Sequence, residues 1–199
     1  MKNEVNRTLV VKKNKKIFLI AIACLMATNL FAQKTYTFDD GVALATDWTV
    51  VDNTSSVGGT AKCEIVTSGK FTAKNSNYLQ FSFENKSGIS ISITSTASFN
   101  NISNITFDAV ANDNSKPNFT LNIVDDSGNV VQNIYSNKTT KADFNTGGTN
   151  KWGVSNSDIS PAVSGHIQLI LLASSSGKYA AIDNLAVTYS ATPVTPTVN

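Results

Sequence analysis

Short runs in which apolar and polar residues alternate recur along the chain from residue 34 to residue 189. In "YLQFSF" the side chains of Leu79, Phe81 and Phe83 fall on one face of an extended chain, and the isoleucines of "ISISIT" (89–94) do the same. A period of two is typical of a strand with one buried face. No segment shows a convincing amphipathic helical pattern. The sequence therefore predicts an all-β protein.

Ten such runs are expected to form strands, with turn residues between them. The predicted strands are 34–38, 47–51, 61–67, 78–83, 88–94, 105–111, 118–125, 130–136, 166–174 and 180–189. "DDSGN" (125–129) reads as a hairpin loop in which Gly128 adopts a positive φ. About ten strands with turns every eight to twelve residues fit a two-sheet antiparallel β-sandwich, and a jelly roll is the expected topology.

The first 32 residues have the pattern of a bacterial secretory signal peptide. A cluster of lysines (12–16) precedes the apolar run "IFLIAIACLMA" (17–27), and "LFA" precedes Gln33. The run is shorter than the roughly 20 apolar residues of a membrane span, so export is favoured over anchorage. Cys24 leaves a lipoprotein signal open, although its box lacks the usual leucine. The protein is expected to be secreted, periplasmic or at the cell surface, without membrane insertion after cleavage.

The charge of the chain changes sign when this leader is set aside. The whole chain carries 16 basic and 14 acidic residues, of which six and one lie in residues 1–32, so 10 − 13 leaves a net charge of −3. The remainder has no Arg and no basic patch. Binding to nucleic acid or to anionic membranes therefore lacks an electrostatic basis.

Residues 33–190 are predicted to form one domain, followed by a Thr/Pro-rich linker or tail at 191–199 that could lead to other domains of a larger protein. Pro193 and Pro196 prevent a continuing strand there, and a frayed terminus is the alternative. Cys63 is the one cysteine left after the leader, so no internal disulfide is expected, and it should pack as a small apolar residue.

An inventory of reactive groups argues against an enzyme. Residues 33–199 hold one histidine, His166, and two glutamates, Glu64 and Glu84. A glycosidase needs two opposed carboxylates, and a serine triad would have to use His166 without a nucleophile elbow. His166 opens an apolar strand, where a capping or satisfied-edge role is expected. No cluster of His and Cys suggests a metal-dependent reaction.

Aromatic side chains give a better indication of function. Proteins bind sugars by stacking the ring on Trp or Tyr and by hydrogen bonds from polar side chains to the hydroxyls. Trp152 lies in the polar, Gly-rich segment "GGTNKWGVSNSD", which reads as a loop, with Asn150, Lys151, Asn156 and Asp158 nearby as candidate ligand-binding residues. Burial of Trp152 as a plug of the sandwich is an equally open alternative. Trp48, beside two valines in a strand, is expected in the core.

Four segments carry a resemblance to known proteins: "YTFDDG" (36–41), "FNNISNITFDAVA" (99–111), "LNIVDDSGNVV" (121–131) and "YAAIDNLAVTY" (179–189). Together they resemble the strands of accessory β-sandwich domains of secreted bacterial glycan-degrading proteins, many of them carbohydrate-binding modules. The resemblance covers nearly all of 34–190 and implies a galactose-binding-like or concanavalin-like jelly roll. It is one of pattern, and none of its motifs is diagnostic of a ligand.

In several such families an acidic residue of the last strand and one near the first strand hold a structural Ca²⁺. Carried over, this implies Asp183 with Asp39 or Asp40 as metal ligands, and calcium as the one cofactor to consider. The alternative is that Asp183 accepts backbone N–H groups in a bulge or turn beside Asn184.

Three functions are consistent with this sequence. The first is a secreted, non-catalytic carbohydrate-binding module that targets an attached or associated enzyme to a polysaccharide. The second is a structural or adhesion β-sandwich without a sugar site. The third is a small jelly-roll lyase or hydrolase, which would need Glu64 and Glu84, or His166 and a lysine, in one cleft. Exposure of Trp152 and a second aromatic ring on one surface would favour the first over the second.

Overall fold

A computed structural model describes residues 30–39, 44–72, 77–84, 87–111, 118–136, 152–173 and 178–191. The compact unit formed by these residues runs from Phe31 to Ser190. The predicted signal peptide up to residue 29, most of the predicted tail, and Asp40, Asn150 and Lys151 lie outside the described residues. None of the helices in the described ranges is long and apolar enough to cross a membrane.

The described chain is built almost entirely of strands, as the alternation predicts. The strands are β1 (Phe31–Tyr36), β2 (Trp48–Asp52), β3 (Thr60–Val66), β4 (Tyr78–Glu84), β5 (Ser90–Ser95), β6 (Phe99–Ala111), β7 (Asn118–Val124), β8 (Val130–Ser136), β9 (Gly153–Leu172) and β10 (Lys178–Ser190). Two single-turn helices, α2 (Leu44–Asp47) and α3 (Thr54–Val57), flank β2. The all-β prediction is confirmed.

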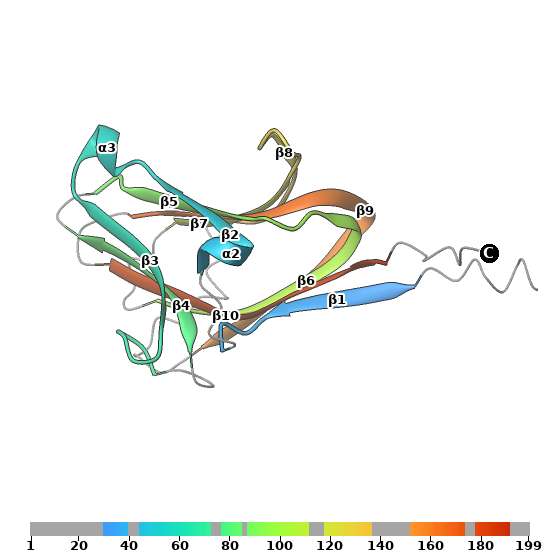
Figure 1. Cartoon of the computed structure of the whole chain (residues 1–199), viewed down its shortest axis with the longest axis horizontal. Coiled ribbons are helices and arrows are strands. Elements are labelled where there is room, and N and C mark those ends of the chain that lie inside the picture. Colours follow the sequence, from blue (N-terminus) through green and yellow to red (C-terminus); the bar gives the residue numbers. More distant parts are fainter. Residues whose placement is uncertain are drawn as a thin grey trace, which may run out of the picture. The chain divides into compact units, whose positions relative to one another are not determined.

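The strands form two antiparallel layers (Figure 1). In the first sheet β10 pairs with β6 along one edge and with β4 and then β1 along the other, while β3 pairs with β4. The second sheet has the order β2-β5-β9-β7-β8. The predicted two-layer β-sandwich is thus the observed architecture.

Strand β9 belongs to both sheets. Residues 153–165 pair with β6 in the first sheet, and residues 166–172 lie between β5 and β7 in the second. Figure 1 shows β9 bending from one layer to the other. The prediction of a loop after Trp152, with a strand only from residue 166, is therefore wrong for residues 153–165.

Residues 153–165 form a strand with one solvent-exposed face, and their polar composition explains why the sequence pattern did not predict it. Ser155 and Ile159 are buried, whereas Val154, Asn156 and Asp158 are exposed. A strand with one solvated face tolerates many polar residues, so hydrophobicity alone does not reveal it. Pro161 is also tolerated here. It lies between Asp158 and Val163, where the pairing of β9 with β6 shifts register, so its missing N–H group breaks no regular ladder bond.

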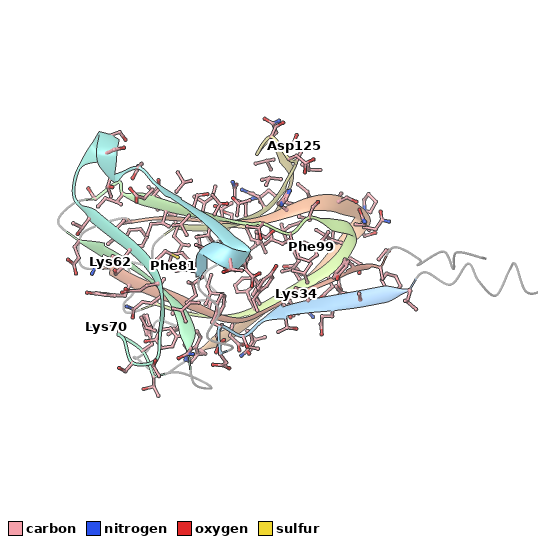
Figure 2. All side chains as sticks on the ribbon, in the orientation of Figure 1. Lys34, Lys62, Lys70, Phe81, Phe99 and Asp125 are labelled. Carbon is pink, nitrogen blue, oxygen red and sulfur yellow. The ribbon has the colours of Figure 1, made fainter. Side chains whose placement is uncertain are left out.

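The core fills the space between the two layers. The alternating residues Leu79, Phe81 and Phe83 are fully buried, and Trp48 is buried as expected. Figure 2 shows Phe81 between the layers, whereas Lys62 and Lys70 lie at the outer surface. Other buried aromatic rings contact one another across the core: Phe107, Phe119 and Tyr135 have centroids 5.5 to 6.1 Å apart. Cys63 packs against this core.

Candidate functional site

The predicted ligand-binding residues that the structure describes lie along one edge of the first sheet. On β9, Asn156 and Asp158 are exposed on the same face as Val154, in continuation of Trp152. The side chain of Asn104 on β6 lies beside them and donates from Nδ2 to Asn156 Oδ1 at 2.6 Å and to Asp158 Oδ1 at 2.7 Å. The fold therefore gathers three side chains capable of hydrogen bonding to a ligand.

Asn104 is a member of this group that sequence reasoning missed. The alternation in "NITFDAV" contains the signal, because Ile105 and Phe107 are buried and Asn104 falls on the opposite face. What the sequence could not supply is the partner strand. The register of β6 and β9 pairs Asn104 with Asp158.

Trp152 is half-buried and has structural contacts of its own. Its indole Nε1 donates to the backbone carbonyl of Thr72 at 3.0 Å. Its ring stands edge to face with Phe71 and Tyr78, with centroids 6.4 and 5.6 Å away. Trp152 thus holds the segment after β3 against the outer face of the first sheet, and any ligand would meet only the remaining part of its ring.

The same segment is fixed by a second set of contacts. The Phe71 backbone N–H donates to the Tyr78 hydroxyl at 3.0 Å, and that hydroxyl donates to the Phe71 carbonyl at 2.8 Å. Lys70 donates its backbone N–H to Gln80 Oε1 at 2.7 Å. These bonds give the buried Tyr78 hydroxyl both a donor and an acceptor, so the surface around Trp152 has a defined shape.

A second aromatic ring lies at the margin of the same cluster. Tyr179 is half-buried and packs with Trp152 against Phe71, Tyr78, Val110 and Ala181. The Lys70 ammonium lies 5.6 Å from the centroid of the Tyr179 ring, and the Tyr179 hydroxyl lies 3.4 Å from Glu84 Oε1. Two part-exposed rings therefore share one surface of the first sheet.

Asp183 lies in a bulge of β10. The register of β10 against β6 shifts between Asp183 and Ala186, at the point where the other neighbour of β10 changes from β4 to β1. Asn184 has a φ of 50°, and its backbone N–H donates to Asp183 Oδ1 at 2.7 Å. The expectation that Asp183 accepts an N–H group in a bulge beside Asn184 is confirmed.

The residues available for a calcium ion are few in the described part of the chain. Asp39 Oδ1 accepts the backbone N–H of Asn77 at 2.7 Å, and Asp183 Oδ1 is bonded as above. Among the described residues no group of three or more Asp, Glu, His or Cys side chains is placed to hold a metal ion. Asp40 is outside the described ranges, so a site at Asp183, Asp39 and Asp40 stays a prediction.

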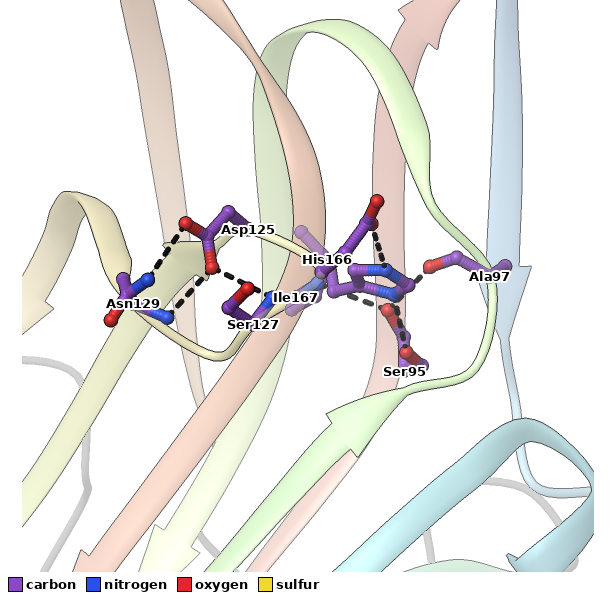
Figure 3. A network of polar contacts seen from close by, with 8 residues as sticks. Ser95, Ala97, Asp125, Ser127, Asn129, His166 and Ile167 are labelled. Carbon is purple, nitrogen blue, oxygen red and sulfur yellow. Dashed lines mark hydrogen bonds and ion pairs between the residues drawn. The ribbon is translucent and has the colours of Figure 1, made fainter.

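His166 links two turns of the sandwich (Figure 3). Its Nδ1 lies 2.8 Å from the Ser95 carbonyl oxygen and its Nε2 lies 3.1 Å from Asp126 Oδ1. The Ser95 hydroxyl accepts the Ile167 N–H at 3.0 Å and donates to the Ala97 carbonyl at 2.7 Å. Both ring nitrogens of His166 thus have partners, which confirms the expected capping or satisfied-edge role.

The two glutamates are separated along the first sheet. Glu64 lies opposite Gln80 and Glu84 lies opposite Thr60, so the two glutamates are four positions apart along the β3–β4 ladder. At about 3.4 Å per residue this is about 14 Å along the strands. Glycosidase pairs lie roughly 5 to 9.5 Å apart, so this pair has a different geometry.

Comparison with known proteins gives similarity in structure only. No protein-family model and no curated protein matches the sequence. The K1 and K2 cleaved adhesin domains of Lys-gingipain, the former from Porphyromonas gingivalis W83, superpose with TM-scores of 0.57 and 0.54 at 15% and 18% identity. The matches cover 80% and 78% of this chain and 99% of each domain.

Carbohydrate-binding modules are also among the structural neighbours. The family 11 module of a cellulosomal cellulase of Clostridium thermocellum has a TM-score of 0.49 at 16% identity, covering 80% of this chain and 95% of the module. Carbohydrate-binding modules, the group named by the resemblance in sequence pattern, are thus among the structural neighbours, and adhesin domains are a second group. At these identities the likeness shows the fold, which is the β-sandwich shared by both groups.

Proposed function

We propose that this protein is an exported, non-catalytic module that binds a polysaccharide and brings an attached or associated enzyme to it. The observation that carries the proposal is the group of Asn104, Asn156 and Asp158 on the same exposed strand face as Trp152. Amide and carboxylate groups that converge on one surface next to an aromatic ring match the hydroxyls and the apolar face of a sugar.

The geometry gives each residue a role in this proposal. Asn156 and Asp158 lie two residues apart on β9 and are exposed, so they would bond to hydroxyls of successive sugar units. Asn104 holds both side chains in place from β6. The uncovered part of the Trp152 ring would contact a sugar ring, while its Nε1 stays bonded to Thr72.

The alternative is a structural or adhesion domain without a sugar site. The contacts of Trp152 favour this function, because a tryptophan that fixes a neighbouring segment has a reason to be there without a ligand. A spacer would also explain the row of Asn104, Asn156 and Asp158 as cross-strand pairs that stabilise the sheet.

Affinity electrophoresis separates the two functions. Gels would contain soluble xylan, mixed-linkage β-glucan or polygalacturonate, and the variants would be Asn156→Ala with Asp158→Ala, and Trp152→Phe. Lys62→Ala is the matched control, since Lys62 is exposed on β3 of the same sheet. Retardation on one polymer that the double variant loses and the control keeps supports the module.

The outcome that contradicts the proposal is equally defined. If the double variant is folded, as shown by circular dichroism, and is retarded as strongly as wild type, the sugar site is not along this edge of the first sheet. If no polymer retards the wild type, the structural or adhesion domain is the better account.

A further inference from the structure

The strands of the second sheet carry almost no formal charge. In β2, β5, β7, β8 and residues 166–172 of β9, the charged and imidazole side chains are Asp52, at the end of β2, and His166. The first sheet differs, with Lys34, Lys62, Glu64, Glu84, Asp108, Asp158 and Asp183 among its described strand residues. The near absence of charged side chains therefore distinguishes the strands of the second sheet from those of the first.

A continuous row of polar side chains crosses the outer side of this sheet, and its members are at least part-exposed except Asn122, which is buried. The strand registers place Thr94 opposite Gln168, Gln168 opposite Asn122, and Asn122 opposite Asn133. Asn133 Nδ2 donates to Asn122 Oδ1 at 2.8 Å, and Asn122 Nδ2 donates to Gln168 Oε1 at 3.3 Å. Gln168 Nε2 lies 3.5 Å from Thr94 Oγ1. The row spans four adjacent strands.

The neighbouring row lies one step further along the strands and combines hydroxyl and aliphatic side chains. It contains side chains from all five strands, and none is charged: Val51, Ser92, Ile170, Thr120 and Ser136. The intervening residues Ile93, Leu121 and Leu169 are buried in the core, so both rows lie on the outer face.

The polar row has capacity for a ligand beyond its internal bonds. A primary amide has two N–H donors and an oxygen with two lone pairs. Asn133 uses one N–H group for Asn122 and is exposed, and Gln168, which is part-exposed, uses one acceptor position and one donor in the row. Donors and acceptors held side by side on adjacent strands match the hydroxyl groups of a polymer.

Charge complementarity decides which polymer fits. The described strands of this sheet supply no lysine or arginine for a phosphate, sulfate or uronate, and one carboxylate for a cation. Protein partners favour an apolar, aromatic patch at the centre of an interface. Here the exposed large apolar residues are valines of the two edge strands, Val50 and Val51 on β2 and Val130 and Val131 on β8, while Ile170 at the centre is only part-exposed.

We propose that the outer face of the second sheet, centred on Asn133, Gln168 and Thr94, binds an uncharged polysaccharide chain. This surface lies on a different sheet from Asn156 and Asp158, so the inference stands or falls separately from the function proposed above. A protein with both sites would hold a polymer at two faces.

Side-chain amide signals give a direct test. The ¹⁵N-labelled protein would be titrated with neutral oligosaccharides from xylan and mixed-linkage β-glucan, and with oligogalacturonate. We expect a neutral oligosaccharide to shift the NH₂ signals of Asn133 and Gln168, and oligogalacturonate to leave them in place. Gln168→Glu, which adds a charge at nearly constant size, should weaken binding at least tenfold.

Two further variants keep the test specific. Thr120→Asp adds a charge to the neighbouring row without touching the amide row and should weaken binding in the same way. Gln33→Glu makes the same change as Gln168→Glu at an exposed position on β1 of the first sheet and should leave the Asn133 shift intact. Thermal denaturation of each variant shows that a loss of binding is not a loss of fold.

Three results would overturn the proposal. The first is that neither neutral oligosaccharide at millimolar concentration shifts Asn133 and Gln168, even if Asn156 and Asp158 respond. The second is that oligogalacturonate shifts the amide row as strongly as the neutral ligands. The third is that sedimentation shows a dimer whose formation, rather than a sugar, accounts for the shifts of these amides.

Discussion

Asp183 on β10 lies directly opposite Asp108 on β6, and both side chains are buried. Asn184 contacts the two carboxylates, through its backbone N–H to Asp183 Oδ1 at 2.7 Å and its Nδ2 to Asp108 Oδ2 at 2.7 Å. A buried carboxylate is stabilised by hydrogen bonds from such donors. The bulge at Asn184 therefore places donors where two acidic side chains meet.

Substitution of Asn184 should separate two contributions to stability. Asn184→Ala loses the bond to Asp108 and puts a residue that disfavours positive φ at 50°. Asn184→Gly loses the bond but accepts that backbone conformation. We expect Asn184→Ala to lower the free energy of unfolding by about 2 to 4 kcal/mol. Asn184→Gly should be about 1 kcal/mol less destabilising, measured by urea denaturation. Equal stability of the two variants would mean that the backbone conformation contributes nothing.

Trp152 should contribute to stability whether or not it binds a sugar. Trp152→Ala removes the ring contacts with Phe71 and Tyr78 and the bond to Thr72. For a half-buried ring we expect a loss of about 2 kcal/mol, and Trp152→Phe, which keeps part of the packing, should lose about 1 kcal/mol. Denaturant midpoints give both values. An unchanged midpoint for Trp152→Ala would show that the segment 67–72 does not depend on this ring.

The hairpin loop between β7 and β8 should lose stability in acid. Hydrogen bonds from the Asn129 side chain, and then from the backbone N–H groups of the turn, hold the pKa of Asp125 below its ordinary value. A carboxyl group whose pKa is lower in the folded than in the unfolded state contributes to the stability of the fold. This stabilisation is fully present above the unfolded pKa, about 3.9, and is lost as the pH falls through the folded pKa. We expect the melting temperature of wild type to fall below about pH 4 more steeply than that of Asp125→Asn.

The control for this loop is Glu64→Gln, because Glu64 is an exposed carboxylate on β3. Its melting temperature should follow wild type across the same pH range. Parallel curves for wild type and Asp125→Asn would contradict the assignment of the acid-sensitive contribution to Asp125.

Removal of divalent cations tests the predicted calcium site. The bulge supplies Asp183 with an N–H donor of the chain itself, and the described residues contain no cluster of three metal-binding side chains. We therefore expect EDTA to leave the melting temperature unchanged within about 1 °C. A fall of several degrees that Ca²⁺ restores, and that Asp183→Asn abolishes, would establish a structural ion instead.

The sequence by itself determined the strands, the hairpin and the buried faces. These features depend on neighbours in the chain: alternation assigns Leu79, Phe81 and Phe83 to the core, and Gly128, with a φ of 82°, completes the loop that "DDSGN" predicts. The strand of residues 153–165 escaped prediction, because its polar outer face hides the alternation and its partner β6 lies about fifty residues away.

Only the tertiary structure decided which residues meet. Trp152 bonds to a carbonyl 80 residues earlier, Asn104 bonds to Asn156 and Asp158, and Asp183 lies opposite Asp108. The row from Thr94 to Asn133 likewise takes one residue from each of four strands. Local periodicity fixes the face of a strand to which a side chain belongs, but the register with a distant strand fixes its neighbours, and register is set by packing of the whole sandwich.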